Sequence, residues 1–158
     1  MRFAAASRGR PCRAARSAVF AVLALCGASA QALDFKSVGA SPAILYDTPS
    51  VKGKKLFVAP RGMPVEVVLT YGDWVKVRDA SGDMAWLEAK ALAARRTVVV
   101  NAAGSRIRAA ADDNSAVVFS ADKGVLLDLL EPAAAGWVKV RHRDGQVGFI
   151  KSAEVWGE

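Results

Sequence analysis

Two copies of one pentapeptide hold the residues in this chain that are best suited to contacting a ligand. Trp-Val-Lys-Val-Arg occupies residues 74–78 and again residues 137–141. In an extended strand, successive side chains point to opposite faces, so the tryptophan, lysine and arginine of each copy share one face. An indole ring can cover the apolar or sugar face of a ligand, and neighbouring cations can hold its carboxylates. The pattern predicts two binding surfaces, formed by Trp74, Lys76 and Arg78 and by Trp137, Lys139 and Arg141.

A structural role for the two tryptophans is the alternative. In that interpretation each ring lies under a neighbouring loop and closes the edge of its domain without touching a ligand. An amphipathic ring beside charges is common in both settings, so the pattern leaves both open. Two further aromatic residues, Trp86 and Phe149, follow a small residue on the next expected strand, and we expect both in the core.

Residues with catalytic chemistry are few after residue 32. His142 is the one histidine of the chain, and both cysteines, Cys12 and Cys26, precede residue 32. The histidine therefore has no thiol to activate and no second histidine with which to share a metal. Asp112-Asp113-Asn114 resembles part of a calcium loop but lacks the glycine and the closing glutamate at their spacing. We expect no enzymatic activity, no metal and no cofactor.

The two copies match well beyond the pentapeptide. Ala85-Trp86-Leu87 corresponds to Gly148-Phe149-Ile150 at the same 63-residue offset, and upstream Leu45 corresponds to Ile107 at an offset of 62. A repeat of about 60 residues is too long for a solenoid unit and suits a small domain with its own core. The chain is therefore predicted to contain two similar β-domains, at residues 33–94 and 95–158.

The first 32 residues are predicted to be a secretory signal peptide. They contain five arginines and no acidic residue, then an apolar run over residues 18–27, and small residues suited to cleavage after Ala32. The apolar run is shorter than the roughly 20 residues of a spanning helix. Cys26 follows Leu25 rather than a small residue, which argues against a lipid anchor. We expect a periplasmic or secreted protein with no stable membrane anchor after cleavage.

Most of the positive charge of the chain belongs to this leader. The whole chain has 22 Lys and Arg against 15 Asp and Glu, a net charge of +7. Without the five leader arginines, 17 basic residues face 15 acidic ones, a net of +2. A charge this small gives no reason to expect a nucleic-acid partner. The absence of cysteine after residue 32 also means that the exported part needs no disulfide.

Valine-rich alternation and closely spaced turns predict an all-β fold. In each copy a strand, a tight turn, the pentapeptide strand, a second tight turn and a return strand follow one another, which is the pattern of a meander. A single helical turn is expected after each return strand, before a last short strand. The expected strands are 65–70, 74–78 and 84–88 in the first copy and 125–130, 137–141 and 146–151 in the second, with a turn at 132–136.

This pattern is similar to a known family. Residues 136–141, Gly145 and residues 148–150 resemble the central hairpin and following strand of a Src-homology-3 (SH3) barrel. With a signal peptide and a tandem arrangement, the chain most resembles the exported bacterial SH3-like proteins, over about residues 38–158. The resemblance implies two tandem SH3-like small β-barrels after the signal peptide.

Eukaryotic SH3 domains bind polyproline helices in an aromatic groove, and the resemblance places the groove tryptophan at Trp74 and Trp137. Of the two groove tyrosines, the first copy keeps Tyr46 and has Thr48 for the other, while residues 107–110 of the second copy contain neither. The groove proline is replaced by Glu88 and Lys151, and the last tyrosine by Ala91 and Glu154. The resemblance therefore does not imply recognition of proline-rich peptides.

The long first loop differs in charge between the two copies. In the first copy it contains Lys52, Lys54 and Lys55, with Arg61 further on, and these can either bind an anionic polymer or be solvated without a ligand. In the second copy the matching residues 111–115 are acidic. We therefore expect the first domain to be the main binding domain, with Tyr46, Lys54 and Lys55 in its ligand site.

These observations favour a non-catalytic periplasmic binding module that recognises a peptide or a cell-wall ligand. The family resemblance alone implies peptidoglycan, in particular its stem peptides. The alternative is a structural or assembly protein whose aromatic faces contact another protein of the cell envelope.

Overall fold

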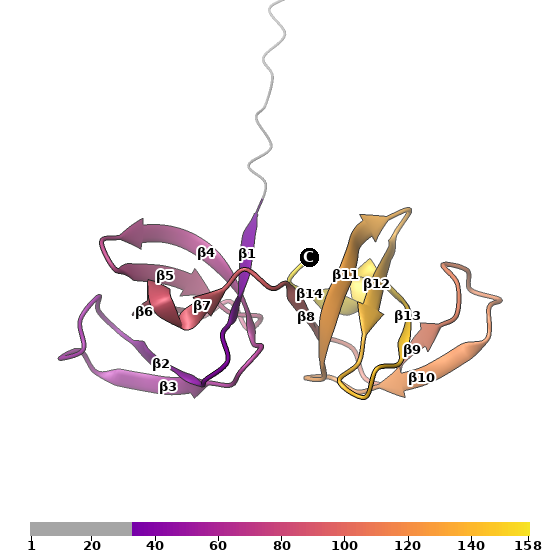
Figure 1. Cartoon of the computed structure of the whole chain (residues 1–158), viewed down its shortest axis with the longest axis horizontal. Coiled ribbons are helices and arrows are strands. Elements are labelled where there is room, and N and C mark those ends of the chain that lie inside the picture. The colour runs from indigo at the N-terminus through magenta and orange to yellow at the C-terminus, as the bar shows by residue number, and fades with distance from the viewer. Residues whose placement is uncertain (1–32) are drawn as a thin grey trace, which may run out of the picture. The chain divides into compact units, whose positions relative to one another are not determined.

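The computed structural model describes residues 33–158 (Figure 1). The predicted signal peptide and its cleavage site after Ala32 lie outside these residues. Within the described part of the chain, no helix is long and apolar enough to cross a membrane. The fold is all-β, as predicted: its regular structure consists of antiparallel strands and two 3-10 helices of one turn each.

The first sheet and its core form barrel 1. Its seven strands lie in the order β3-β2-β6-β5-β4-β1-β7, and all the neighbouring pairs are antiparallel. A one-turn helix, η1 (Ala89–Ala91), joins β6 to β7. The strands are β1 (Asp34–Val38), β2 (Ala43–Tyr46), β3 (Lys55–Ala59), β4 (Pro64–Tyr71), β5 (Trp74–Arg78), β6 (Met84–Glu88) and β7 (Leu92–Ala93).

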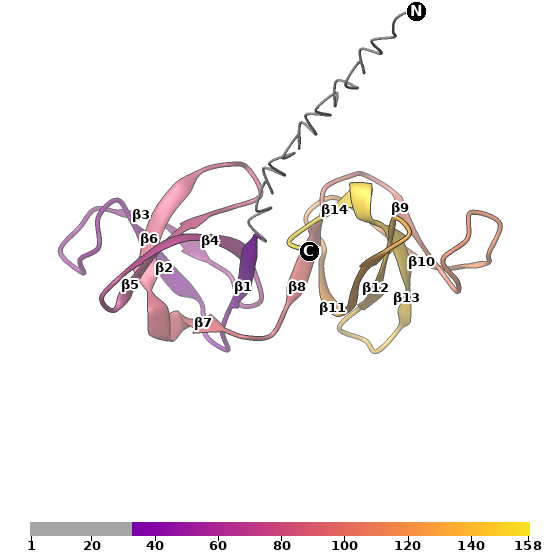
Figure 2. The same ribbon diagram turned by 90° about the horizontal axis from the view of Figure 1, so that it is seen from above.

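The second sheet repeats this order strand for strand and forms barrel 2. Its order is β10-β9-β13-β12-β11-β8-β14, and η2 (Ser152–Glu154) joins β13 to β14. Figures 1 and 2 show each sheet curled on itself. The strands are β8 (Thr97–Val100), β9 (Ser105–Arg108), β10 (Val117–Ala121), β11 (Leu126–Ala134), β12 (Trp137–Arg141), β13 (Val147–Lys151) and β14 (Val155–Trp156).

The pentapeptide strands alternate between core and surface as their sequence predicts. Val75 and Val77 of β5 are 4% and 0% exposed, while Trp74, Lys76 and Arg78 of the other face are half-buried. The valines of β12 are likewise buried. Each barrel has its own core of nine buried apolar or small residues, and no residue belongs to both cores. Burial of a valine side chain contributes about 1.5–3 kcal/mol, so these alternating valines stabilise each sheet in its register.

The change of offset between the copies has a structural explanation in β11. Strand β4 has eight residues and β11 has nine. The β4–β5 pair has one irregularity of register, between Val67 and Leu69, and the β11–β12 pair has two, on either side of Glu131. A β-bulge accommodates one extra residue in a strand without disturbing the rest of its pairing. The extra residue in β11 therefore returns the offset from 62 to 63 before β12 begins.

The turn predicted at residues 132–136 is wrong in its extent. Strand β11 continues through Pro132 to Ala134, which pairs with Trp137, so the turn is only Ala135-Gly136. Both turn residues have positive φ, 50° and 81°, as in the two-residue turns that match the twist of a hairpin. Pro132 is tolerated because it lies in the irregular stretch of the ladder, where a missing N–H costs little.

The expectation that Trp86 and Phe149 belong to the core is also wrong. On β6 the buried residues are Ala85 and Leu87, at 3% and 0% exposed, and Trp86 lies between them on the opposite face. Phe149 has the same position on β13. Successive side chains of a strand point to opposite faces, so a core leucine at position 87 requires that residue 86 faces outward. Both aromatic rings are half-buried on the face that holds the pentapeptide lysines.

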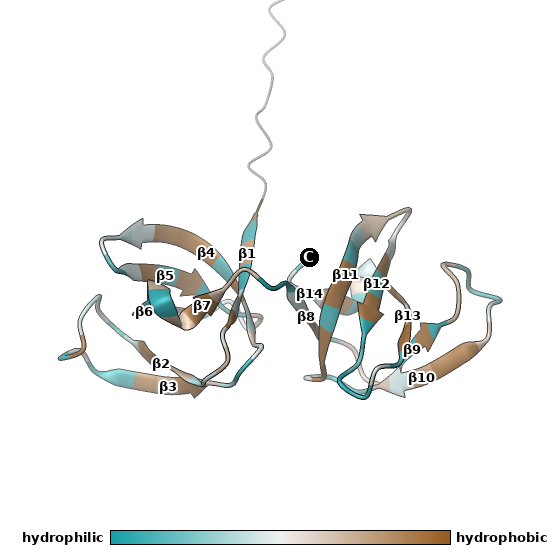
Figure 3. Cartoon of the chain, in the orientation of Figure 1, coloured by the Kyte–Doolittle hydropathy of each residue, from teal (hydrophilic) through white to brown (hydrophobic). Residues whose placement is uncertain are grey.

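The edge strands β3 and β10 are rich in apolar residues (Figure 3). Leu56, Phe57 and Val58 of β3 are 44%, 37% and 61% exposed, and Val117 and Val118 of β10 are 46% and 40% exposed. An apolar edge strand is a place where another chain can add to a sheet.

Candidate functional site

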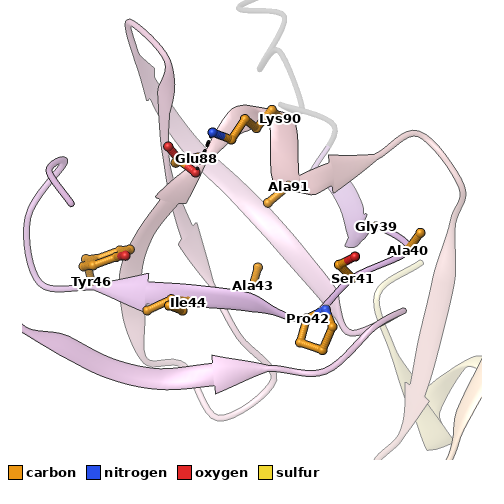
Figure 4. Close-up of a pocket in the computed structure, with 10 residues that line it drawn as sticks. All are labelled: Gly39, Ala40, Ser41, Pro42, Ala43, Ile44, Tyr46, Glu88, Lys90 and Ala91. Carbon is orange, nitrogen blue, oxygen red and sulfur yellow. Dashed lines mark ion pairs between the residues drawn. The ribbon is translucent and has the colours of Figure 1, made fainter.

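A cavity of about 480 Å³ opens on barrel 1 between the β1–β2 loop, strand β2 and the helix η1 (Figure 4). We call it groove 1. At its rim Lys90 Nζ lies 3.1 Å from the Glu88 carboxylate, so these two charges neutralise each other. The rest of the lining is apolar or small, apart from Ser41 and the Tyr46 hydroxyl. The lining residues are Gly39, Ala40, Ser41, Pro42, Ala43, Ile44, Tyr46, Glu88, Lys90 and Ala91.

Tyr46 and Trp74 form an aromatic pair beside groove 1. Their ring centroids are 5.5 Å apart and the rings are nearly perpendicular, at 85°. Trp74 is the residue opposite Glu88 in the β5–β6 ladder, so it stands beside the end of the groove at which Glu88 lies. An edge-to-face pair of this kind contributes about 0.5–1.5 kcal/mol beyond the area that it buries. The pair holds the Trp74 ring in one orientation, which lowers the entropy cost of binding a ligand against it.

Cations stand on both sides of this aromatic pair. Lys55 lies opposite Tyr46 in the β2–β3 ladder, and Lys76 lies opposite Trp86 with its Nζ 5.9 Å from the centre of that ring. Trp86 is in turn the ladder partner of Tyr46. Sequence reasoning missed Trp86 as a surface residue, although the alternation of Ala85 and Leu87 indicated its face. The structure thus brings Tyr46, Trp74, Lys55 and Lys76 together.

The other residues predicted for the first site are Arg78 and Lys54. Arg78 donates a hydrogen bond from Nη1 to Oε2 of Glu66 on β4 at 3.0 Å, and the Glu66 side chain is only 12% exposed. Lys54 is exposed in the β2–β3 loop, where its backbone N–H donates to the Asp47 carboxylate at 2.9 Å. Of the residues predicted for the first site, only Tyr46 lines the cavity itself.

Barrel 2 has a smaller cavity of about 240 Å³ at the corresponding place, which we call groove 2. Arg106 replaces Ile44, Arg108 replaces Tyr46 and Lys151 replaces Glu88 at the offsets of the repeat. The position of Ala91 is Glu154. The two grooves therefore differ in chemistry: groove 1 is apolar and aromatic, whereas groove 2 is lined by charges. Its lining residues are Gly104, Arg106, Arg108, Asp113, Trp137, Lys151 and Glu154.

Most of the cations near groove 2 already have partners within barrel 2. Lys151 Nζ lies 2.7 Å from Asp113 Oδ1 and 5.6 Å from the centre of the Trp137 ring. Arg108 donates from Nη1 to the Ser115 carbonyl at 2.6 Å. The remaining predicted residues, Lys139 and Arg141, form ion pairs with Glu131 at 2.7 Å and with Asp128 at 3.2 Å. Trp137 thus lines a charged groove and, unlike Trp74, is not placed against a tyrosine.

The family model described as "Bacterial SH3 domain" matches the chain twice, over residues 39–93 and residues 102–157. The chain belongs to the bacterial SH3 domain family. The predicted resemblance and the predicted tandem of SH3-like barrels are thereby confirmed. No curated protein matches the chain.

Three solved structures that resemble this pair of bacterial SH3 domains belong to longer chains. NlpC2 and NlpC1 from Trichomonas vaginalis are each 12% identical, with TM-scores of 0.38, and the matches cover 82% and 88% of this chain. An NlpC/P60 family protein from Bacillus cereus ATCC 10987 is 16% identical, with a TM-score of 0.37 and 78% of this chain covered. The matches cover 50%, 51% and 56% of those chains, so this chain spans about half of their length.

The single histidine of the two SH3 domains is part of a hairpin ion pair. His142 Nδ1 lies 3.0 Å from Asp144 Oδ2, and the same carboxylate accepts hydrogen bonds from the backbone and side-chain amides of Gln146 at 3.0 Å. Within residues 33–158, no group of three His, Cys, Asp or Glu residues is placed to hold a metal ion.

The Asp144 carboxyl is expected to titrate below the ordinary range of aspartate. The backbone N–H of Gln146, followed by the His142 side chain, lowers its pKa from 3.8 because both stabilise the charged form. A depressed pKa in the folded state makes a contribution to stability above the unfolded pKa, and that contribution is lost as the pH falls through the folded pKa. An NMR titration of the Asp144 side-chain carboxyl carbon should therefore give a midpoint below 3.8, and Gln146→Ala should leave most of the shift because the backbone donor remains. A midpoint at or above 3.8 contradicts this hydrogen-bond geometry.

Proposed function

We propose that the chain is an exported, non-catalytic binding module that holds a peptide or a cell-wall polymer in groove 1. Peptidoglycan stem peptides are the proposed ligand class. The ligand lies along the loop and strand β2, with an apolar segment against Tyr46 and Trp74 and with carboxylates toward Lys55 and Lys76.

The observation that carries this proposal is the aromatic pair beside an apolar cavity. A half-buried tryptophan next to a concave surface, with cations at the edge, is the arrangement in which aromatic residues contribute most to binding. The 480 Å³ of groove 1 accommodate a few residues of an extended peptide. Glu88 and Lys90 pair with each other, so neither is left as an unpaired charge at the rim of the groove.

Export is part of the same proposal. Residues 1–32 act as the signal peptide, and the secreted chain begins at Leu33 with domains at 33–94 and 95–158. Mass spectrometry of the protein recovered from the periplasm or the medium tests this directly. We expect an N-terminus at Leu33, and a recovered N-terminus at Met1 contradicts export by cleavage.

A second function, assembly with another envelope protein, is favoured by the apolar edge strand β3. Its exposed side chains, Leu56, Phe57 and Val58, lie on the unpaired edge of the first sheet. An extended segment of a partner can add to such an edge through backbone hydrogen bonds. In this function the recognised feature is a strand of another protein, and groove 1 has no ligand.

NMR titration of residues 33–158 with soluble peptidoglycan fragments separates these two functions. If groove 1 binds the fragments, the indole N–H of Trp74 and the amides of residues 39–46 shift first, while the amides of β3 beyond Lys55 change little. Shifts that are absent at millimolar fragment contradict the proposed ligand. A matched titration with uncrosslinked glycan strands that lack peptide shows whether the peptide or the sugar is recognised.

A further inference from the structure

The two barrels differ in charge at the end of the β4–β5 pair and its counterpart in barrel 2, away from both grooves. In barrel 1, Glu66 and Arg78 face each other across the ladder and form one ion pair. The next residue is Asp79, so the net charge of this cluster is −1. In barrel 2 the same ladder positions hold Asp128 and Arg141, which are also paired. The residue after Arg141 is a histidine rather than an aspartate.

Two further arginines join the cluster in barrel 2. Arg95 donates from Nη2 to Oδ1 of Asp128, whose second oxygen accepts from Arg141 at 3.2 Å. Arg143 stands where barrel 1 has Ala80, and it has no ion-pair partner among residues 33–158. The Asp128 side chain is 14% exposed, so one largely buried carboxylate orients two guanidinium groups. Each guanidinium has five N–H donors, and most of these remain available.

These groups line a cavity of about 650 Å³, which we call the basic cavity. Four arginines contribute positive charges to its wall, with His142 beside them, and Asp128 is the one carboxylate among its lining residues; the arginines are Arg61, Arg95, Arg141 and Arg143. The three arginines of barrel 2 and Asp128 leave a surplus of +2, against −1 in the barrel 1 cluster, and Arg61 of the β3–β4 loop raises the surplus to +3. Leu126 and Val125 provide an apolar floor. Both barrels thus have an ion pair at this ladder position. Only barrel 2 has further cations around it, so the two positions have the same fold and different charge.

From this arrangement we infer that the basic cavity, most of whose lining comes from barrel 2, is a second ligand site, for a phosphate group. Guanidinium groups match the geometry of phosphate oxygens through paired N–H donors, and the multiple negative charges of a phosphate or pyrophosphate offset the surplus of positive charge. Asp128 fixes the orientation of Arg95 and Arg141 before the anion arrives, so the entropy cost of ordering side chains falls mainly on Arg61 and Arg143. The site is independent of the proposed peptide site in groove 1.

Calorimetric titration of residues 33–158, which contain both sheets and both cores whole, tests this inference. The probes are inorganic phosphate and pyrophosphate at low ionic strength, with acetate as the carboxylate comparison. We expect pyrophosphate to bind more tightly than acetate, and Arg143→Ala to weaken its binding about tenfold, since a charge-assisted hydrogen bond of ordinary strength has that effect. The affinity of Arg143→Lys for pyrophosphate should lie between those of the wild type and Arg143→Ala, because lysine keeps the charge and lacks the paired N–H donors of a guanidinium group.

Matched controls separate a built site from general positive charge. Lys123→Ala removes one positive charge from an exposed turn of barrel 2 outside the cavity, and it should change pyrophosphate binding less than twofold. An equal loss of affinity in Lys123→Ala and Arg143→Ala, or no binding of either phosphate by the wild type, overturns the inference.

Sedimentation with phosphatidylglycerol vesicles and with phosphatidylcholine vesicles identifies the source of the phosphate. If only phosphatidylglycerol vesicles retain the chain, through Arg143, the ligand is a lipid headgroup. If pyrophosphate binds and the vesicles do not, the ligand is soluble.

Discussion

Replacing Trp74 by alanine is expected to weaken the binding of peptidoglycan fragments about thirtyfold while barrel 1 stays folded. The ring faces away from the core, and the core valines of the same strand, Val75 and Val77, are unchanged. Truncation of a central aromatic residue in a binding site costs about 2 kcal/mol or more, which corresponds to that factor. The loss of the edge-to-face contact with Tyr46 removes about 0.5–1.5 kcal/mol of stability, too little to unfold a domain with an intact core.

Trp137→Ala is the matched control for this prediction. It removes the same residue type from the same strand position of the other SH3 domain, where the groove is charged and no tyrosine contacts the ring. Titration of both variants with the same fragment, with thermal unfolding of each, separates binding from folding. If Trp74→Ala unfolds barrel 1, or if the two variants lose equal affinity, groove 1 is not the principal site.

Introducing a single methyl group at Gly148 is expected to destabilise barrel 2 by about 1–3 kcal/mol, the usual range for overpacking a core. A Cβ at this residue would lie 2.5 Å from Cγ2 of Ile107 and 2.7 Å from the backbone oxygen of Arg108. Both contacts are shorter than real Cβ contacts, and the second involves backbone of the neighbouring strand β9. In barrel 1 the same position is Ala85, and Leu45 of the same core stands in place of the β-branched isoleucine.

This comparison predicts a partial rescue. Ile107→Leu removes the Cγ2 methyl group that the new Cβ would strike, so the double variant Gly148→Ala with Ile107→Leu should be less destabilised than the sum of the two single changes. Urea unfolding followed by tryptophan fluorescence measures all three variants, and Ala85→Gly in barrel 1 provides the reciprocal change. Additive effects, or a stability of Gly148→Ala equal to that of the wild type, contradict the packing described for β9 and β13.

The sequence predicts the hairpin strands well because their pattern is strictly alternating. The bounds of β5, β6 and β12 agree with the ranges expected, and the two single helical turns lie where the sequence places them. The start of the turn after β11 was harder to predict, since a proline such as Pro132 is typical of turns. Its tolerance in a strand depends on a bulge that only the pairing with β12 reveals.

The candidate site could be predicted only in part. Trp74 and Tyr46 follow from the family resemblance, and their contact is formed by strands that lie 28 positions apart in sequence. The charged character of groove 2 was not expected. It depends on residues such as Arg106 and Lys151, which belong to no local sequence motif. They line one cavity only because the fold brings β9 and the end of β13 together. The offset of the repeat, applied residue by residue to Ile44 and Tyr46, was the signal that could have found it.

Retention of residues 33–158 on purified peptidoglycan sacculi tests directly whether groove 1 binds the cell wall. The wild-type chain and Trp74→Ala are incubated with sacculi and sedimented, and the bound fraction is measured over a range of protein concentrations. We expect saturable retention of the wild type and at least tenfold weaker retention of Trp74→Ala, with Trp137→Ala close to the wild type. If the wild type remains in the supernatant, the cell-wall function is contradicted, and the apolar edge strand β3 becomes the surface to examine for a protein partner.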